Sequence, residues 1–124
     1  PSGTFLGAGS FDSSTGVGLN THTAWTAAEQ ADGSVKLTLS VYVRSYTLEI
    51  GQRSIAISVN GATSGGMTRS FSVDSPNSQT DTLIYTYSTT VQKGSAVSVS
   101  VDWNYKGQYS GRDLDVISSS STIF

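Results

Sequence analysis

The chain has 124 residues, which is enough for one domain with a single hydrophobic core and too few for two. Charged residues make up only 13%, against roughly 25% in an average soluble protein, and serine and threonine take their place at about three residues in ten. The net charge of −2 and the pI of about 5.0 supply no cationic field for phosphate backbones, so we expect no nucleic-acid partner.

The sequence contains no cysteine and no run of about 20 apolar residues. We therefore predict no membrane span, no disulfide and no thiolate metal site. No charged and then apolar leader precedes a cleavage site in the chain as it stands, so we also predict no signal peptide. No phosphate-binding glycine loop is present, and we expect no cofactor.

Residues 1–20 are rich in Gly, Ser and Thr and hold few large apolar groups beyond Phe5, Leu6 and Phe11. Two interpretations compete for this segment. It is either a local edge strand followed by a loop, which we prefer, or an arm that adds to the sheet of a neighbouring subunit. We set it apart from a sandwich formed by residues 21–124.

From residue 21 onward, apolar and polar residues alternate with the period of two of a half-buried strand. The pattern is clearest between Val35 and Val43. We expect seven or so strands, at residues 21–29, 35–43, 55–59, 67–73, 83–90, 96–103 and 114–123, with residues 46–50 as a loop or bent strand. Asp32-Gly33, Asn60-Gly61 and Lys93-Gly94 are predicted tight turns.

No segment has apolar residues at helical spacing over three turns, so the predicted fold class is all-β. Short strands separated by Gly, Asn or Asp turns are typical of an immunoglobulin-like β-sandwich of about seven antiparallel strands. A jelly roll or a barrel stays open as the alternative, because the same alternation builds either and the strand order cannot be deduced.

The residues that acid–base or nucleophilic catalysis needs are scarce. His22 is the only histidine, and its position beside two threonines at the start of a strand favours a surface residue over a catalytic base. Asp102, Asp113 and Asp115 are the only carboxylates expected to gather, and their spacing does not match a calcium loop. We therefore predict no enzyme, no catalytic residue and no metal site.

The strongest candidate for a binding site in the sequence is a cluster of aromatic residues. The segment 103–113 combines three rings with amides and charges at a strand end, and its predicted ligand-binding residues are Trp103, Tyr105, Gln108, Tyr109 and Arg112. Flat rings beside polar groups suit sugars and protein interfaces alike. The competing interpretation places Trp103 in the core and uses a tyrosine to pin a corner of the sandwich. Tyr42, Arg44 and Tyr46 form a second, weaker candidate patch.

The segments 23–26, 34–45 and 55–61, followed by 97–103 and 105–111, resemble immunoglobulin-like modules of siphophage and prophage tail and minor structural proteins. The resemblance covers roughly residues 21–123 and rests on strand pattern and turn chemistry. Such modules often carry a His-x-x-Asp-Gly-Ser stretch before the penultimate strand, whereas residues 91–95 here have neither histidine nor aspartate.

The resemblance implies an accessory role on a virion, and it supplies no catalytic residues. The predicted function is therefore a non-catalytic binding or adhesion module at a virion or extracellular surface, with a host-surface glycan or a protein as partner. The alternative is a purely structural subunit of a tail, fibre or capsid decoration, which self-associates through its N-terminal segment and sheet edges.

Overall fold

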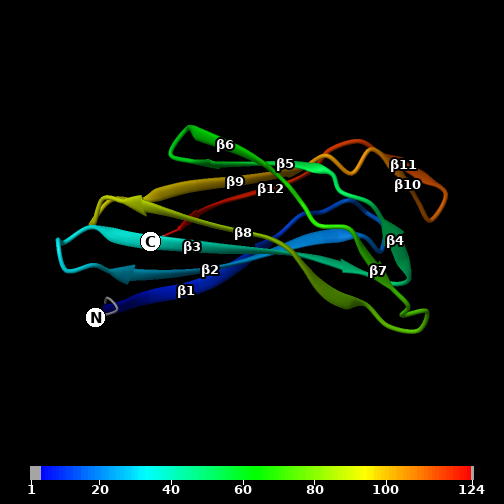
Figure 1. Ribbon diagram of the computed structural model, residues 1–124, viewed down its shortest axis with the longest axis horizontal. Helices are drawn as coiled ribbons and strands as arrows, with labels where there is room; N and C mark the ends of the chain where they lie inside the picture. Colours follow the sequence, from blue (N-terminus) through cyan, green and yellow to red (C-terminus); the bar gives the residue numbers. More distant parts are fainter. Residues whose placement is uncertain (1–3, 124) are drawn as a thin grey trace.

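The computed structural model describes residues 4–123, and all regular structure in that range is β. Two four-stranded antiparallel sheets face each other and form an elongated sandwich (Figure 1). The predicted all-β class and the sandwich are confirmed. Residues 4–123 contain no helix that is long and apolar enough to cross a membrane.

The first sheet has the order β1-β2-β3-β8, with the strands β1 (Thr4–Asp12), β2 (Asn20–Glu29), β3 (Val35–Ser45) and β8 (Thr80–Val91). Alternation along β3 puts its aliphatic side chains on the inner face, each at most 2% exposed: Val35, Leu37, Leu39, Val41 and Val43. The sequential strands β1, β2 and β3 are neighbours, an order that differs from the two Greek keys of a jelly roll.

The second sheet has the order β12-β9-β5-β6, with the strands β5 (Ser54–Val59), β6 (Ala62–Met67), β9 (Val97–Trp103) and β12 (Ile117–Ile123). Its inner face contributes Ile55, Ile57, Val97, Val99 and Val101, each at most 1% exposed. The turn between β5 and β6 has positive φ at Asn60 and Gly61, as a two-residue type I′ hairpin requires.

Two short two-stranded sheets complete the fold at one end of the sandwich (Figure 1). β4 (Leu48–Ile50) pairs with β7 (Phe71–Val73), and β10 (Gly107–Tyr109) pairs with β11 (Arg112–Leu114). The strand expected at residues 67–73 is therefore wrong, because β6 ends at Met67 and β7 begins at Phe71 in another sheet. The backbone N–H of Thr68 still donates to the carbonyl of Arg53, opposite it across the β5–β6 pair, whereas that of Arg69 donates to the carbonyl of Ile84 on β8, so the chain changes partner between these two residues.

Residues 4–20 of the N-terminal segment belong to the sandwich. β1 lies antiparallel to β2 from Thr4 to Asp12, with one bulge near Leu6. Leu19 is fully buried and β2 already begins at Asn20, so the boundary expected between residues 20 and 21 is not a structural one. The indole of Trp25 lies over Gly7 and Gly9 and covers backbone that has no side chain of its own.

Two tyrosines of β8 close one flank between the sheets. Tyr87 on the inner face of β8 hydrogen-bonds to the hydroxyl of Ser64 on β6 at 3.0 Å. Tyr85 packs against the backbone of Gly66, where an added Cβ would lie 2.2 Å from its hydroxyl oxygen. The glycine-rich β6, which has no apolar alternation, is therefore a strand that makes room for rings from the opposite sheet.

Replacing Gly66 by alanine should lower the free energy of unfolding by about 1–3 kcal/mol, because the half-buried Tyr85 ring must move. Gly65→Ala is the matched control, since its nearest neighbour, the Ile55 carbonyl oxygen, lies 4.0 Å from the added Cβ. Chemical denaturation measures both. Equal stability of the two variants would contradict the proposed packing of Tyr85.

Candidate binding surface

Trp103 and Tyr105 are core residues. Trp103 is 0% exposed and Tyr105 is 4% exposed, and their ring centroids lie 5.3 Å apart. The Tyr105 hydroxyl donates to the carbonyl of Gln108 at 2.7 Å, and burial raises the pKa of this phenol. Their predicted role as ligand contacts is wrong, because an external molecule cannot reach their faces. They hold the start of the β10–β11 hairpin in place.

The hairpin presents the other three residues of the predicted aromatic site. Gln108 and Arg112 are exposed and Tyr109 is half-buried. The Tyr109 hydroxyl accepts the backbone N–H of Tyr46 at 3.1 Å, and the Arg112 guanidinium donates to the carbonyl of Thr15 at 2.8 Å. These bonds connect the hairpin to the end of β3 and to the loop between β1 and β2.

The loop 13–19 is held by its own hydrogen bonds. The Asn20 amide oxygen accepts from the Ser13 hydroxyl and from the backbone N–H of Thr15, and the Thr15 hydroxyl donates to the carbonyl of Leu19. Buried Leu19 anchors the loop in the core. A loop with this many internal bonds is a rigid support for the side chains around it.

Gly18 in this loop lies under two tyrosine rings. An added Cβ at Gly18 would be 3.0 Å from the Tyr46 ring and 3.7 Å from the Tyr109 ring. Tyr46 is 40% exposed and keeps an accessible aromatic surface. The structure therefore joins Tyr46, from the second predicted patch, to residues of the first. We call Tyr46, Gln108, Tyr109 and Arg112 the aromatic end.

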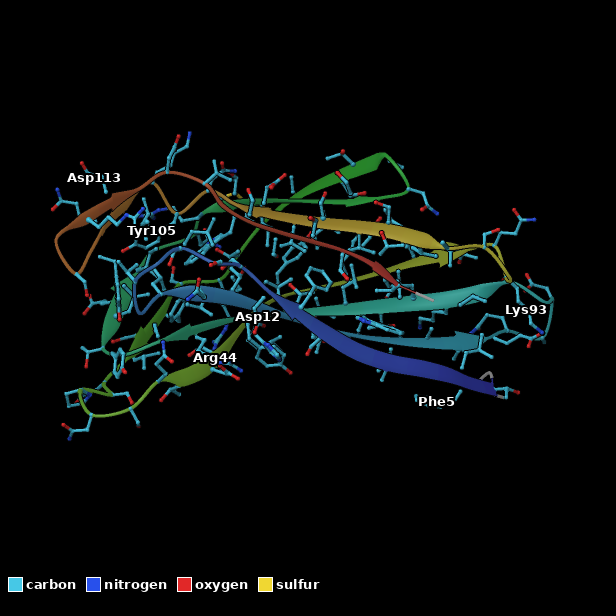
Figure 2. The ribbon with its side chains drawn as sticks, turned by 180° about the vertical axis from the view of Figure 1, so that it is seen from behind. Phe5, Asp12, Arg44, Lys93, Tyr105 and Asp113 are labelled. Atoms are coloured by element: carbon cyan, nitrogen blue, oxygen red, sulfur yellow. The ribbon has the colours of Figure 1, made fainter. Side chains whose placement is uncertain are left out.

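Tyr42 and Arg44 lie on the outer face of the first sheet, among polar and charged side chains from three other strands. One cross-strand row contains Asp12, His22 and Tyr42, and the next contains Asn20, Arg44 and Asp81. His22 Nδ1 is 2.5 Å from an Asp12 carboxylate oxygen, and the His22 ring lies 6.2 Å from the Tyr42 ring between centroids. Figure 2 shows Asp12 beside Arg44.

A pocket of about 170 Å³ opens beside these rows, lined by Asp12, Ser13, Asn20, Thr21, His22, Arg44 and Gln79. We call it the polar pocket. The Gln79 amide also donates to the carbonyl of Gly18 at 3.0 Å, so the polar pocket adjoins the aromatic end through this contact. Asp12, Asn20 and Gln79 were missed in the sequence because they come from separate strands and loops.

Arg44 is held in place by two carboxylates. Its Nε and Nη2 donate to the two oxygens of Asp81 at 2.8 and 3.1 Å, and its Nη1 lies 3.8 Å from a carboxylate oxygen of Asp12. The hydrogen bond from Arg44 lowers the pKa of the Asp81 carboxyl. A bidentate pair fixes the plane of the guanidinium, and it therefore also fixes the directions of the remaining N–H groups.

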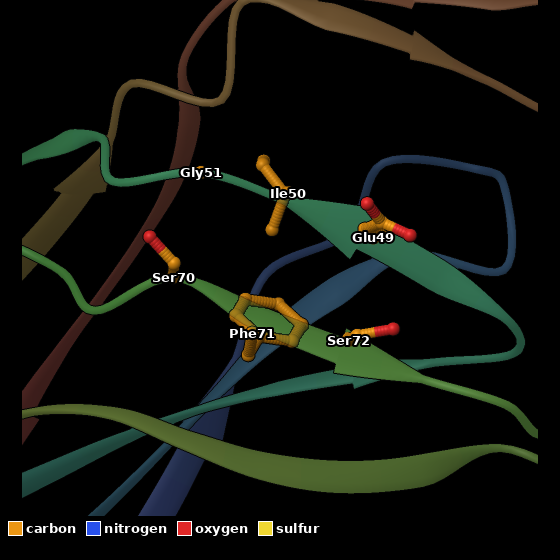
Figure 3. Close-up of a pocket in the computed structure, with 6 residues that line it drawn as sticks. All are labelled: Glu49, Ile50, Gly51, Ser70, Phe71 and Ser72. Carbon is orange, nitrogen blue, oxygen red and sulfur yellow. The ribbon is translucent and has the colours of Figure 1, made fainter.

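Other candidate sites are weaker. A larger groove of about 460 Å³ lies along β4 and β7, but its ring, Phe71, is buried and Glu49 is its only charged side chain (Figure 3). Asp102, Asp113 and Asp115 belong to no metal-binding group, since residues 4–123 contain no cluster of three or more potential ligands among His, Cys, Asp and Glu.

Comparison with known proteins adds no relative: no family model, curated protein or solved structure matches the chain. The polar pocket and the aromatic end are therefore interpreted from their own geometry.

Replacing Asp81 by asparagine should lower the free energy of unfolding at pH 7 by up to about 1 kcal/mol, because this ion pair is exposed. Asp81 has a lowered pKa in the folded chain, so its contribution is complete above the ordinary value of 3.8 and is lost as the pH falls through the folded value. Urea denaturation between pH 7 and pH 2.5 should show the two proteins converging in acid.

Asp115→Asn is the control, because the Asp115 side chain forms no ion pair within residues 4–123. A difference between wild type and Asp81→Asn that stays constant down to pH 2.5 would contradict the role assigned to the pair.

Proposed function

We propose that this chain is a non-catalytic binding module that recognises a carbohydrate with the polar pocket and the aromatic end. The observation that supports this most directly is the junction at Gln79 and Gly18, which places exposed tyrosine surface next to a small polar pocket. Rings stack on the apolar C–H faces of a sugar, while neighbouring polar groups hold its hydroxyls.

The composition of the polar pocket favours a polar ligand without a large net charge. Arg44, Asn20 and Gln79 supply donors, and Asp12 supplies acceptors. Asp12 and Asp81 offset the charge of Arg44, so the pocket has little field for attracting anions. The closely spaced hydroxyls of a sugar, each of which both donates and accepts hydrogen bonds, match this mixture of donors and acceptors.

The rigidity of the site favours binding as well. Arg44 is fixed by Asp81, and the loop 13–19 is fixed by Asn20 and by Arg112. Groups that are already ordered lose little conformational freedom when a ligand binds, and this improves affinity. The three residues of the aromatic end that lie on the β10–β11 hairpin have the same advantage, because the buried Tyr105 hydroxyl donates to the carbonyl of Gln108 and holds the hairpin in place.

We further propose that the module is immunoglobulin-like and works at a virion or extracellular surface. The order β2-β3-β8 opposite β12-β9-β5-β6 allows these strands to correspond to A-B-E and G-F-C-C′ of such a sandwich, with β1 as an added edge strand. This correspondence supports the resemblance to phage tail and minor structural modules. Host-surface glycans are the ligands that such a location would offer.

A glycan array tests the carbohydrate proposal, followed by calorimetry with the best glycan. Arg44→Ala should weaken binding by about 10- to 100-fold, because it removes a charged hydrogen-bond donor. Tyr46→Ala should weaken it by about tenfold, since it removes the ring but keeps the backbone N–H that Tyr109 accepts.

Lys36→Ala is the matched control for charge, because Lys36 lies on the outer face of the same strand and outside the polar pocket. It should bind like wild type. Retention of full affinity by both Arg44→Ala and Tyr46→Ala would contradict the assignment of the binding site. Failure of wild type to bind any glycan would contradict the proposal that the ligand is a carbohydrate.

A further inference from the structure

β1 is the edge strand of the first sheet, so the backbone groups on its outer side have no strand partner among residues 4–123. The backbone N–H of Ser13 donates to the carbonyl of Thr21 at 3.0 Å, in register with the β1–β2 ladder. Because N–H groups alternate in direction along a strand, the N–H groups of Phe11 and Gly9 also point toward β2. Those of Ala8, Ser10 and Asp12 point away from the sheet, toward solvent.

β1 has one of the usual protections against strand pairing, the bulge near Leu6, but between Ala8 and Phe11 the strand is regular and carries none of the others. Natural edges are blocked by lysine, proline, inward-pointing charges or a covering loop. Residues Thr4–Phe11 contain no charge and no proline, and residues 8–10 are small and exposed. The opposite edge of the same sheet differs, since Arg69 donates to the carbonyls of Leu83 and Ile84 on β8.

Apolar side chains are exposed at the start of the same strand. Phe5 is 69% exposed and Leu6 is 39% exposed. Phe5 lies opposite Ala28, on the outer face of the sheet, at the end of β1 that is far from the polar pocket (Figure 2). Ala8 and Ser10 lie on that same outer face and leave space beside the strand for a ring from a neighbour.

We propose that β1 pairs antiparallel with β1 of a second copy, so that two first sheets become one continuous sheet of eight strands. An antiparallel pair of identical edges is related by a two-fold axis perpendicular to the sheet, so each donor meets the equivalent acceptor of its mate. Phe5 of each copy then covers the small outer-face residues of the other, and the assembly closes at two.

The pairing has a consequence for the proposed carbohydrate site. A two-fold axis perpendicular to the sheet leaves both outer faces on the same side of the dimer. Asp12, at the end of β1, places a polar pocket near each end of the seam. Two copies would therefore present two pockets to one surface, which raises avidity for a repeating ligand.

Analytical ultracentrifugation over a concentration series tests the pairing, with Ala8→Pro as the variant. Proline removes an N–H that points away from β2, so it leaves the β1–β2 ladder intact. Because the change occurs twice in a symmetric dimer, the dissociation constant should rise by at least about tenfold. Ala8→Ser keeps the N–H and should dimerise like wild type.

Circular dichroism and thermal unfolding establish that Ala8→Pro is folded. If it is not, amide hydrogen exchange of wild type decides, because the N–H groups of Ala8 and Ser10 should become protected only at concentrations where the dimer forms. A wild type that is monomeric at millimolar concentration, an assembly larger than two, or a dimer without that protection would overturn the proposal. Unchanged dimerisation of folded Ala8→Pro would do the same.

The proposed dimer and the proposed carbohydrate site can be tested independently of each other. Monomeric Ala8→Pro should bind a monovalent glycan like wild type and lose only the gain on a multivalent surface. Loss of monovalent binding by Arg44→Ala should leave the dimer unaffected.

Discussion

The fold depends on burying one aliphatic face of each sheet against the other. The chain has no cysteine, so no disulfide contributes to its stability. Full burial of a valine, leucine or isoleucine contributes about 1.5–3 kcal/mol. The central strands β3, β5 and β9 carry most of these residues, and the two sheets are held at the spacing that their side chains set.

That spacing determines what happens at the flanks and at one end. On one flank, Tyr85 and Tyr87 span from β8 to β6 and use the missing side chain of Gly66. On the other, Trp25 covers the glycines of β1. At the end, Tyr105 is buried under the β10–β11 hairpin and positions it against the loop 13–19. Each of these aromatic residues contributes to the packing of the fold.

The proposed binding surface is built on top of this frame. Tyr46 and Tyr109 come from segments 63 residues apart and meet because the hairpin folds back onto the end of β3. The polar pocket takes side chains from β1, β2, β3 and the segment before β8. A rigid sandwich with a site at its loops and strand ends is a common arrangement for binding proteins, since loops vary while the frame is retained.

Sequence alone determined the all-β class, the strands β2, β3, β5, β8 and β9 and the tight turn at Asn60-Gly61, because an alternating apolar face and a type I′ turn are local properties. It left Trp103 and Tyr105 ambiguous between core and surface, and it could not show that β6 is a strand. Only the tertiary structure decided these points: a ring's exposure depends on which sheet covers it, and the role of Gly66 depends on Tyr85. The grouping of Asp12, Asn20, Arg44 and Gln79 was beyond sequence reasoning for the same reason, since strand register brings together residues that no spacing along the chain connects.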